Sequence, residues 1–287
     1  MVAVWMVTYN HGEFIENAIE SAMMQKSTFK YKLFIGEDNS TDKTREICKK
    51  LKEKYAHKIE LILHKKNIGA NPNGIYMYKK CFESGAKYIA MLEGDDYWTD
   101  PYKLQKQVDF LETNSSLVGC FHNSEERYWN DYSKASNLFL SFSCGREVSI
   151  SEITEYNMVP TASVVFKTPV PREIFTEEFK TLPMGDWPIH LLNTRKGNYY
   201  YMPQIMSVRN LHPSSVWSSK PQNENVKKIL DAYKILLKSD WFENEVLELL
   251  KIGAKNLQNQ FKPRKYSKRF TLKKRVINKL IRILNKI

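Results

Sequence analysis

The feature that most restricts the fold is a regular alternation of short apolar runs and longer amphipathic segments over the first 122 residues. The runs are rich in β-branched and aromatic residues, which predicts strands at residues 2–7, 31–35, 59–63, 88–92 and 117–122. Helical spacing of apolar residues between them predicts helices at 13–25, 41–55, 72–84 and 100–112. Strands that alternate with helices favour a mostly parallel, Rossmann-like sheet flanked by helices, so we expect an α/β fold.

The pattern is looser in the second half of the chain. We expect a loop or insertion at residues 128–142, strands at 162–166, 199–201 and 205–209, and a helix at 187–194. Two further helices, separated near Ser239, are predicted between residues 223 and 260. The sequence therefore predicts a body over residues 1–220, with halves 1–112 and 113–220. A helical C-terminal extension at 221–260 and a basic amphipathic tail at 261–287 follow it.

The composition indicates the setting in which the chain works. The 287 residues are 42% hydrophobic and 26% charged, which is typical of a globular protein. The four cysteines form no C-x-x-C pair, and no apolar run approaches the roughly 20 residues of a membrane helix. The first residues lack the basic flank and the length of a signal peptide. We therefore expect a reducing, cytoplasmic location.

The net charge of +12 is concentrated in the tail. Residues 262–287 hold 11 of the 44 lysines and arginines and no acidic residue, so the other 33 basic and 32 acidic residues nearly balance. From Val276 the apolar residues follow helical spacing, and a cationic helix with one apolar face suits an anionic membrane surface. A tail that packs on the body or on a second subunit, and a solvated end, remain alternatives. So does a nucleic-acid-binding tail, although the nearly neutral body and the lack of a recognisable module argue against it.

Polar clusters follow three of the predicted strands. They are Thr8-Tyr9-Asn10-His11-Gly12, Glu37-Asp38-Asn39-Ser40-Thr41-Asp42 and Glu93-Gly94-Asp95-Asp96. Each alone could be a turn or a helix cap, but parallel strands end at one edge of a sheet, where open α/β sheets bind ligands. The third cluster puts three carboxylates directly after a buried strand, and such charges are usually compensated by a divalent cation. We therefore predict a metal site that faces a phosphate-bearing substrate.

The order of these motifs, with Asn67-Ile68-Gly69-Ala70 between the second and the third, resembles the nucleotide-sugar-binding half of family 2 glycosyltransferases of the GT-A fold. Those enzymes typically show T-Y-N, D-D-x-S-x-D, N-x-G and D-x-D-D at these places. The resemblance extends over about residues 1–215 and is strongest over 1–112. This chain has Glu37 and Glu93 where aspartate is usual, and the longer side chain reaches differently. The resemblance implies a GT-A catalytic domain over residues 1–220.

The resemblance also implies roles for individual residues. Those expected against the base, the ribose or nearby parts of the donor nucleotide are Thr8, Tyr9, Asn10, Glu37, Asp38 and Asn67. Asp96 is the expected direct ligand of Mn²⁺ or Mg²⁺, and Asp95 is expected to contact the ribose or to be a second ligand. A divalent metal that bridges the donor diphosphate neutralises the charge that develops as the nucleotide departs.

Two segments of the second half resemble further motifs of the family. Asp186 stands where inverting members have their general base, and a carboxylate in hydrogen-bond reach can take the proton of an acceptor hydroxyl. It could also be a helix N-cap, or serve as both. Arg209 and His212 stand in an R-x-x-H segment, in which arginine neutralises phosphate and imidazole can ligate Mn²⁺. Residues 161–163 are expected on the acceptor side.

Several other residues have an ordinary interpretation that we prefer. Trp187 could stack on a sugar, but a place in the core is the simpler expectation. We treat His11, His64 and His190 as histidines without a special role.

These observations together predict a metal-dependent inverting glycosyltransferase of the hexosyltransferase type, peripheral at the inner face of the cell membrane. The donor is expected to be a UDP-sugar, and the acceptor a glycan or lipid-linked molecule in cell-surface polysaccharide or glycoconjugate synthesis. A sugar-1-phosphate nucleotidyltransferase shares a similar fold and metal chemistry, but it requires a glycine-rich loop with a basic residue that residues 8–12 do not supply. Walker and dinucleotide fingerprints are absent, which argues against an ATPase or a dehydrogenase.

Overall fold

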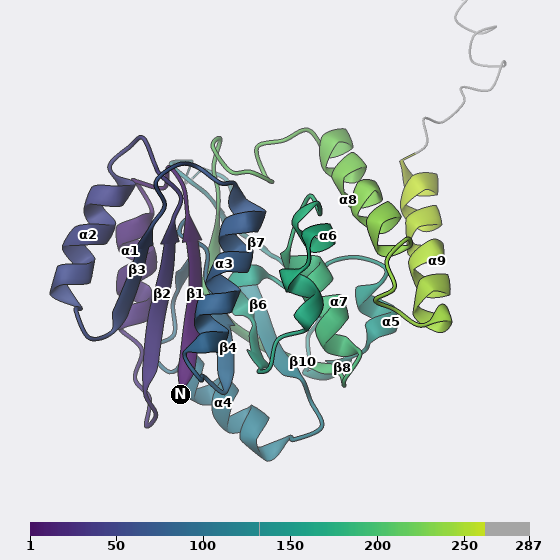
Figure 1. Ribbon diagram of the computed structural model, residues 1–287, viewed down its shortest axis with the longest axis horizontal. Helices are drawn as coiled ribbons and strands as arrows, with labels where there is room; N and C mark the ends of the chain where they lie inside the picture. Colours follow the sequence, from purple (N-terminus) through teal and green to yellow (C-terminus); the bar gives the residue numbers. More distant parts are fainter. Residues whose placement is uncertain (132, 262–287) are drawn as a thin grey trace, which may run out of the picture.

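A mixed β-sheet forms the centre of the protein, with helices on both of its faces (Figure 1). The computed structural model describes residues 1–131 and 133–261. The strands are β1 (Val2–Thr8), β2 (Tyr31–Glu37), β3 (Ile59–Leu63), β4 (Tyr88–Met91), β5 (Tyr97–Trp98), β6 (Gly119–Tyr128), β7 (Asn137–Leu138), β8 (Arg146–Val148), β9 (Val165–Lys167) and β10 (Tyr199–Leu211). Their order in the sheet is β3-β2-β1-β4-β9-β6-β10-β5, with β7 beside β6 and β8 beside β10.

The helices follow the predicted alternation closely in the first half. They are α1 (Ile15–Met23), α2 (Thr44–Lys54), α3 (Ala70–Glu83), α4 (Lys103–Thr113), α5 (Ile150–Ile153), α6 (Glu177–Lys180), α7 (Asp186–Thr194), α8 (Gln222–Leu236) and α9 (Asn244–Gln260), with 3-10 turns η1 (Thr161–Ser163) and η2 (Arg172–Phe175). The predicted strands and helices of residues 1–112 are all present, and their ends differ from the predictions by at most a few residues.

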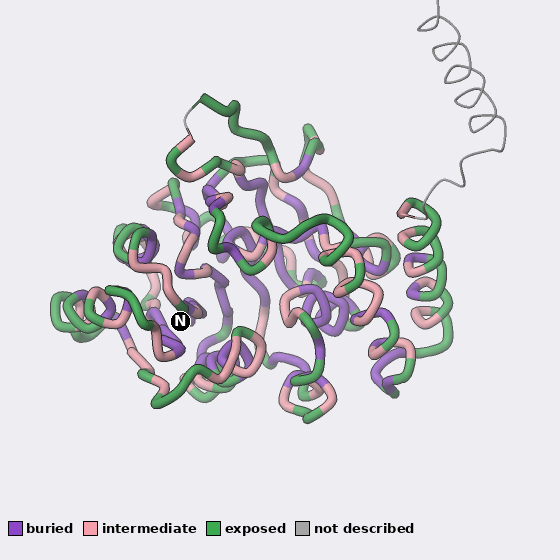
Figure 2. The backbone as a smooth tube through the Cα atoms, turned by 90° about the horizontal axis from the view of Figure 1, so that it is seen from above, coloured by how far each residue is buried: buried purple, intermediate pink, exposed green. Residues whose placement is uncertain are grey.

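The period-two pattern of β1 divides the core between the two faces of the sheet. Val4 and Met6 pack on one face with Ile15 and Ile19 of α1. Trp5 faces the other side, where its indole N–H donates to the carbonyl oxygen of Gly74 in α3 at 2.9 Å. Because β1 is covered on both faces, it consists almost entirely of apolar residues. Figure 2 shows the buried backbone at the centre of the molecule and the exposed residues on the outer turns.

The sheet is parallel from β3 to β4 and mixed beyond it. β9 runs antiparallel to both β4 and β6, and β10 runs parallel to β6 but antiparallel to β5 and β8. The predicted separation of residues 199–201 and 205–209 into two strands is wrong, because β10 is one strand whose register to β6 shifts at Met202 and Ile205. The predicted loop at 128–142 contains β7, and the first part of the predicted strand 162–166 is the turn η1.

Helices α8 and α9 lie at the end of the molecule opposite α1 and α2 (Figure 1). Helix α8 packs on the body through Tyr233, whose ring meets Trp187 edge to face at 4.8 Å and whose hydroxyl donates to the carbonyl oxygen of Thr154 at 2.7 Å. The predicted helical extension is therefore present and docked. Within the part of the chain that the structure describes, no helix combines the length and the apolar character needed to cross a bilayer. The basic tail at 262–287 lies outside the described residues.

Candidate active site

Three strand ends meet at one edge of the sheet, as the sequence predicts. Thr8 and Glu37 are register partners at the ends of β1 and β2, and β4 pairs with β1 on the other side. The chain after β4 continues alongside β1, since the N–H groups of Leu92 and Gly94 donate to the carbonyl oxygens of Trp5 and Val7, each at 3.0 Å. A Cβ atom on Gly94 would lie 2.7 Å from Thr8 Cβ. A residue without a side chain is therefore required where these two clusters approach each other.

The carboxylates after β4 form a compact group. One oxygen from each of Glu93, Asp95 and Asp96 lies within 4.8 Å of the other two. The end of β10 holds this group: the backbone N–H of Asn210 donates to Asp96 Oδ1 at 3.0 Å, and its side-chain amide donates to the carbonyl oxygen of Asp95 at 2.5 Å. Residues more than one hundred positions apart in the sequence, Asn210 and the two aspartates, are thus in direct contact at the site.

Two imidazoles face the same oxygen of Asp95. The Nε2 atoms of His212 and His11 lie 3.1 Å and 3.7 Å from Asp95 Oδ2. Their Nδ1 atoms lie near hydroxyl oxygens, at 2.8 Å from Ser214 Oγ and 3.3 Å from Thr8 Oγ1, which leaves both Nε2 atoms directed at the carboxylate. The structure therefore places His11 in this group, although the sequence analysis assigns it no special role. Its place directly after a strand that ends at the crevice is the sequence signal that could have found it.

The carboxylates of Glu93, Asp95 and Asp96 lie close enough together to affect one another's ionisation. Burial and the nearby Asp95 and Asp186 carboxylates raise the pKa of Glu93 to about 8. Burial, then Asp95 and Glu93, also raise the pKa of Asp96. Burial opposes ionisation of Asp95 as well, but the two imidazoles hold the pKa of Asp95 below its usual value. Carboxylate oxygens with imidazole nitrogen beside them are a donor set that fits Mn²⁺, and the oxygens also suit Mg²⁺.

Arg209 lies beside this group on β10. Its guanidinium donates to Glu126 Oε1 at 2.8 Å and lies 5.7 Å from the ring centre of Phe139. Its positive charge opposes the rise in the pKa values of Glu93 and of Asp186 that burial causes. Arg209 therefore brings positive charge to the neighbourhood of these acidic groups.

Asp186 is the first residue of α7, and Gly185 precedes it at the N-cap position. Asn157 Nδ2 donates to Asp186 Oδ2 at 2.7 Å, and the backbone N–H of Trp187 donates to the same carboxylate. Burial raises the pKa of Asp186 despite these hydrogen bonds and the charge of Arg209. The carboxylate is thus partly engaged with the first turn of its helix, and it belongs to the same charged neighbourhood as Glu93.

The acids after β2 have partners inside the protein. Glu37 is fully buried, accepts from the N–H of Ser40 at 2.6 Å and forms an ion pair with Arg45. Asp38 accepts from the N–H groups of Ile68 and Gly69 at 2.8 Å and 2.9 Å. Glu37 thus holds its own loop, and Asp38 holds the loop at residues 67–69. A contact of Glu37 or Asp38 with the base or ribose stays a prediction.

The remaining donor-side residues lie at the surface of the same edge. Tyr9 is 42% exposed. Asn10 has a positive φ of 54° and its Oδ1 accepts from the N–H of Thr41 at 2.9 Å. Asn67 is exposed, with Oδ1 at 3.1 Å from the N–H of Gly69. Tyr9 thus offers an open aromatic face, whereas the asparagines shape the loops around it.

Other residues have the structural roles that we preferred. Trp187 is 1% exposed and its indole N–H donates to the carbonyl oxygen of Ile153 at 2.7 Å, which confirms its place in the core. His190 is buried against Tyr199. His64 Nε2 lies 3.0 Å from Asn73 Oδ1. All four cysteines fall within the described residues and are unpaired.

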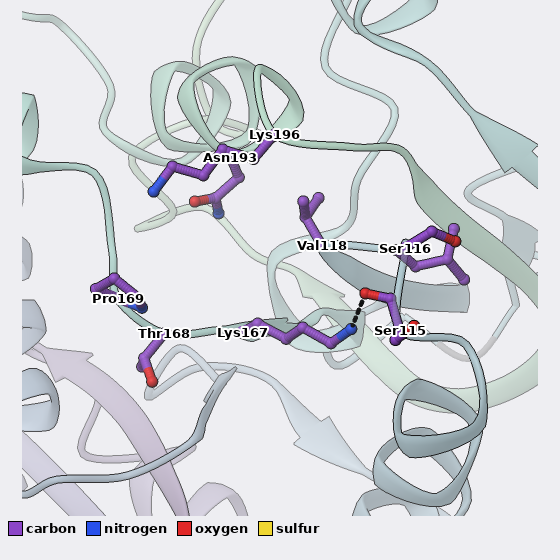
Figure 3. Close-up of a pocket in the computed structure, with 9 residues that line it drawn as sticks. Ser115, Ser116, Val118, Lys167, Thr168, Pro169, Asn193 and Lys196 are labelled. Carbon is purple, nitrogen blue, oxygen red and sulfur yellow. Dashed lines mark hydrogen bonds between the residues drawn. The ribbon is translucent and has the colours of Figure 1, made fainter.

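A cavity of about 170 Å³ lies away from this edge (Figure 3). Lys167 lines it and pairs with Tyr88, the first residue of β4, whereas the carboxylates follow the last residue of that strand. Lys167 Nζ donates to the carbonyl oxygen of Ser115 at 2.9 Å, and Asn193 and Lys196 form the opposite wall. The cavity is therefore separate from the site at the strand ends.

Comparison with known proteins identifies the family. The model of the family described as glycosyl transferase family 2 matches residues 3–170 of this chain. An uncharacterized protein of Mycobacterium tuberculosis (strain ATCC 25618 / H37Rv) is 30% identical over 220 residues, which is 76% of this chain and 61% of that protein. A dTDP-rhamnosyl transferase of Shigella flexneri is 27% identical over 125 residues, 43% of this chain and 42% of that protein. The chain belongs to glycosyl transferase family 2, and it spans 61% of the length of the first curated relatives that it matches.

Solved structures with the same architecture support the fold. Residues 1–349 of TarS from S. aureus, in complex with UDP-GlcNAc, superpose with a TM-score of 0.63 at 18% identity, covering 91% of this chain and 73% of that one. The mannosyltransferase PcManGT from Pyrobaculum calidifontis, in complex with GDP-Man and Mn²⁺, gives 0.61 at 12% identity, covering 90% and 69%. At these identities the likeness is one of fold, and it confirms the GT-A type of α/β architecture.

Proposed function

We propose that this chain is a metal-dependent inverting glycosyltransferase that transfers a sugar from a nucleotide-sugar donor, with UDP as the nucleotide. The observation that carries the proposal is the meeting of Glu93, Asp95 and Asp96 with His212 at the strand ends, with Asp186 in the same charged neighbourhood. Family membership and the solved complexes of similar fold with UDP-GlcNAc and GDP-Man support a nucleotide-sugar donor.

The residues at the edge of the sheet would bind the donor diphosphate. Asp95, Asp96 and His212 would hold Mn²⁺ or Mg²⁺, and that cation would neutralise charge on the departing nucleoside diphosphate. Arg209 would add a second positive charge beside the phosphates, although it shares its guanidinium with Glu126. Thr8, Tyr9 and Asn10 would form the wall against base and ribose, with Tyr9 as the exposed ring.

Asp186 would act on the acceptor. As the acceptor hydroxyl attacks the anomeric carbon, its proton passes to the carboxylate, and the bond between that carbon and the diphosphate oxygen breaks on the opposite side. This single displacement inverts the anomeric configuration. Burial raises the pKa of Asp186, which makes its carboxylate a stronger base than an exposed aspartate. Asn157 would hold the carboxylate in orientation through its bond to Oδ2.

The acceptor and the location are proposed from the tail. We infer that the acceptor is a glycan or a lipid-linked molecule in cell-surface polysaccharide or glycoconjugate synthesis, at the inner face of the cell membrane. Residues 262–287 carry 11 basic residues and no acidic ones, which suits anionic lipid. Sedimentation of the full chain with anionic and with zwitterionic vesicles tests this. Binding to anionic vesicles should weaken when Lys273, Lys274 and Arg275 are changed to Gln, and equal binding to both vesicle types would contradict it.

The enzymatic proposal is tested by a screen of nucleotide sugars. The melting temperature of the chain is measured with each donor in the presence of Mn²⁺, of Mg²⁺ or of EDTA. We expect at least one donor to raise it only with a divalent cation, since binding to the folded state stabilises it. Asp95→Asn keeps the shape of the side chain and should lose the metal-dependent part. Failure of every donor to bind or to be hydrolysed, with or without metal, would refute the proposal.

A further inference from the structure

Asn71 lies where the donor side of the crevice meets the segment that leads to Asp186. It is the second residue of α3, and its side chain reaches across to the end of α6. Figure 1 shows the ribbons of these two helices in the same region of the molecule. The amide Nδ2 is 3.0 Å from the carbonyl oxygen of Phe179, 3.3 Å from that of Lys180 and 3.1 Å from that of Leu182. These carbonyls belong to the last turn of α6 and to the residues after it, where carbonyl oxygens commonly lack helical partners. That of Phe179 also accepts from the N–H of Leu182 at 3.2 Å. The amide of Asn71 therefore holds the end of α6 from outside.

The other atom of the same amide group touches the far end of the segment. A Cβ atom on Gly185 would lie 2.6 Å from Asn71 Oδ1. Gly185 has φ −107° and ψ −26°, a conformation that alanine can also adopt, so the restriction at this position comes from Asn71 and not from the backbone. One short side chain thus contacts both ends of the stretch from Phe179 to Gly185, and Asp186 follows directly.

The base of Asn71 is fixed to the donor side. Gly69, two residues earlier, donates its N–H to Asp38 Oδ2 at 2.9 Å, and the N–H of Asp38 donates to the carbonyl oxygen of Thr8 at 3.0 Å. Hydrogen bonds from the end of β1 to Asp38 and Gly69, the backbone of residues 69–71 and the side chain of Asn71 therefore connect the donor side to the segment before Asp186.

We propose that Asn71 is a positioning residue that sets the distance between the bound donor and the Asp186 carboxylate. The inference rests on the proposed function, because it assigns Asp186 to the acceptor. Proton transfer requires the base within about 2.6–3.2 Å of the attacking hydroxyl, while that hydroxyl must also reach a donor held at the strand ends. Misplacement of one partner by about 1 Å can lower the rate about 100-fold.

The direct test compares Asn71→Ala with the wild type in transfer from a donor identified by the screen. We expect kcat for transfer to fall about 10- to 100-fold while KM for the donor stays within about threefold, because Asn71 touches the base segment and not the nucleotide. Asn71→Asp is similar in size but puts a carboxylate against three carbonyl oxygens, and it should not restore activity. A Kd for the donor that rises as much as kcat falls would overturn the inference.

A double-mutant cycle separates positioning from general loss of stability. Gly185→Ala should lower kcat in the wild-type chain, because the added methyl group displaces the Asn71 amide. In the Asn71→Ala background the same change should have a much smaller effect, because the obstructing oxygen is gone. Equal effects in the two backgrounds would overturn the inference. Rates are expressed per folded molecule, with the melting temperature of each variant recorded.

Asn114→Ala is the matched control. Asn114 Nδ2 also donates to a carbonyl at the end of a helix, that of Phe110 in α4 at 2.8 Å, but near the edge of the sheet where β4 begins. We expect this variant to lose stability and to keep kcat. If Asn71→Ala behaves like Asn114→Ala while the wild type transfers sugar, the positioning role is refuted and the proposed function stands. If the wild type transfers no sugar, the proposed function itself fails.

Discussion

Lys103 gives a prediction whose size follows from the structure. Its side chain is fully buried, with Nζ donating to Gln107 Oε1 at 2.7 Å and lying 4.3 Å from the ring centre of Trp98. Removal from water lowers the pKa of Lys103 from 10.5 to about 7. In the unfolded chain the amine keeps its ordinary pKa. Between pH 7 and about pH 10 the unfolded state therefore binds more protons than the folded state.

The consequence is a stability that rises with pH over that interval. The slope approaches about 1.4 kcal/mol per pH unit, so the contribution from Lys103 between pH 7 and pH 9 is about 2 kcal/mol. Lys103→Met removes the titrating group and keeps most of the packing volume. We expect the variant to gain stability relative to the wild type at pH 7, and this advantage to shrink by about 2 kcal/mol at pH 9. Gln107 loses its hydrogen bond from Lys103 in the variant at pH 7 and at pH 9 alike, so this loss does not contribute to the change with pH.

Urea unfolding of both proteins at pH 7 and pH 9 measures this difference. Comparing the two proteins at each pH cancels the other titrating groups that they share. Lys106→Met is the control, since Lys106 lies on the same helix with a half-exposed side chain, and the stability difference between this variant and the wild type should not change by about 2 kcal/mol between pH 7 and pH 9. If the difference between the wild type and Lys103→Met is the same at pH 7 and pH 9, the argument from burial is refuted.

Three further outcomes test the site. Asp186→Asn should lower transfer about 100- to 10,000-fold with an unchanged donor Kd, and equal transfer by variant and wild type would exclude it as the base. The sugar product should have inverted configuration by NMR, and retention would contradict the single displacement. His11→Gln should weaken Mn²⁺ binding about tenfold or more by electron paramagnetic resonance, because its Nε2 faces Asp95 Oδ2 at 3.7 Å. His64→Gln is its control, and equal Mn²⁺ affinities in the two variants would show that His11 has no such role.

The first half of the fold could be predicted because its signals are local. Strands β1 to β4 are apolar runs, and parallel strands buried on both faces require such runs. Polar residues are therefore found after the apolar runs and not within them. Because β1, β2 and β4 are parallel neighbours, Thr8, Glu37 and the acids after β4 then meet at the same edge of the sheet. The family resemblance rests on the same residues, and the match over residues 3–170 confirms it.

The second half was less predictable because its strands are defined by their partners. β9 has three residues, and its pairing with both β4 and β6 depends on the gap between those strands. β10 contains Pro203 and a change of register, which divides its pattern into two short pieces in the sequence although the strand is continuous. Short-range periodicity does not register a bulge that only the neighbouring strand makes visible.

What the sequence alone determined about this protein is therefore which residue types reach the edge of the sheet, since that follows from strand ends along the chain. The tertiary structure decided which of them face one another. It turned His11 toward Asp95, engaged Glu37 within its own loop, and joined Asn71 to the segment before Asp186. Contacts of this kind depend on distances and directions between elements that are distant in the chain, and no local pattern of residues specifies them.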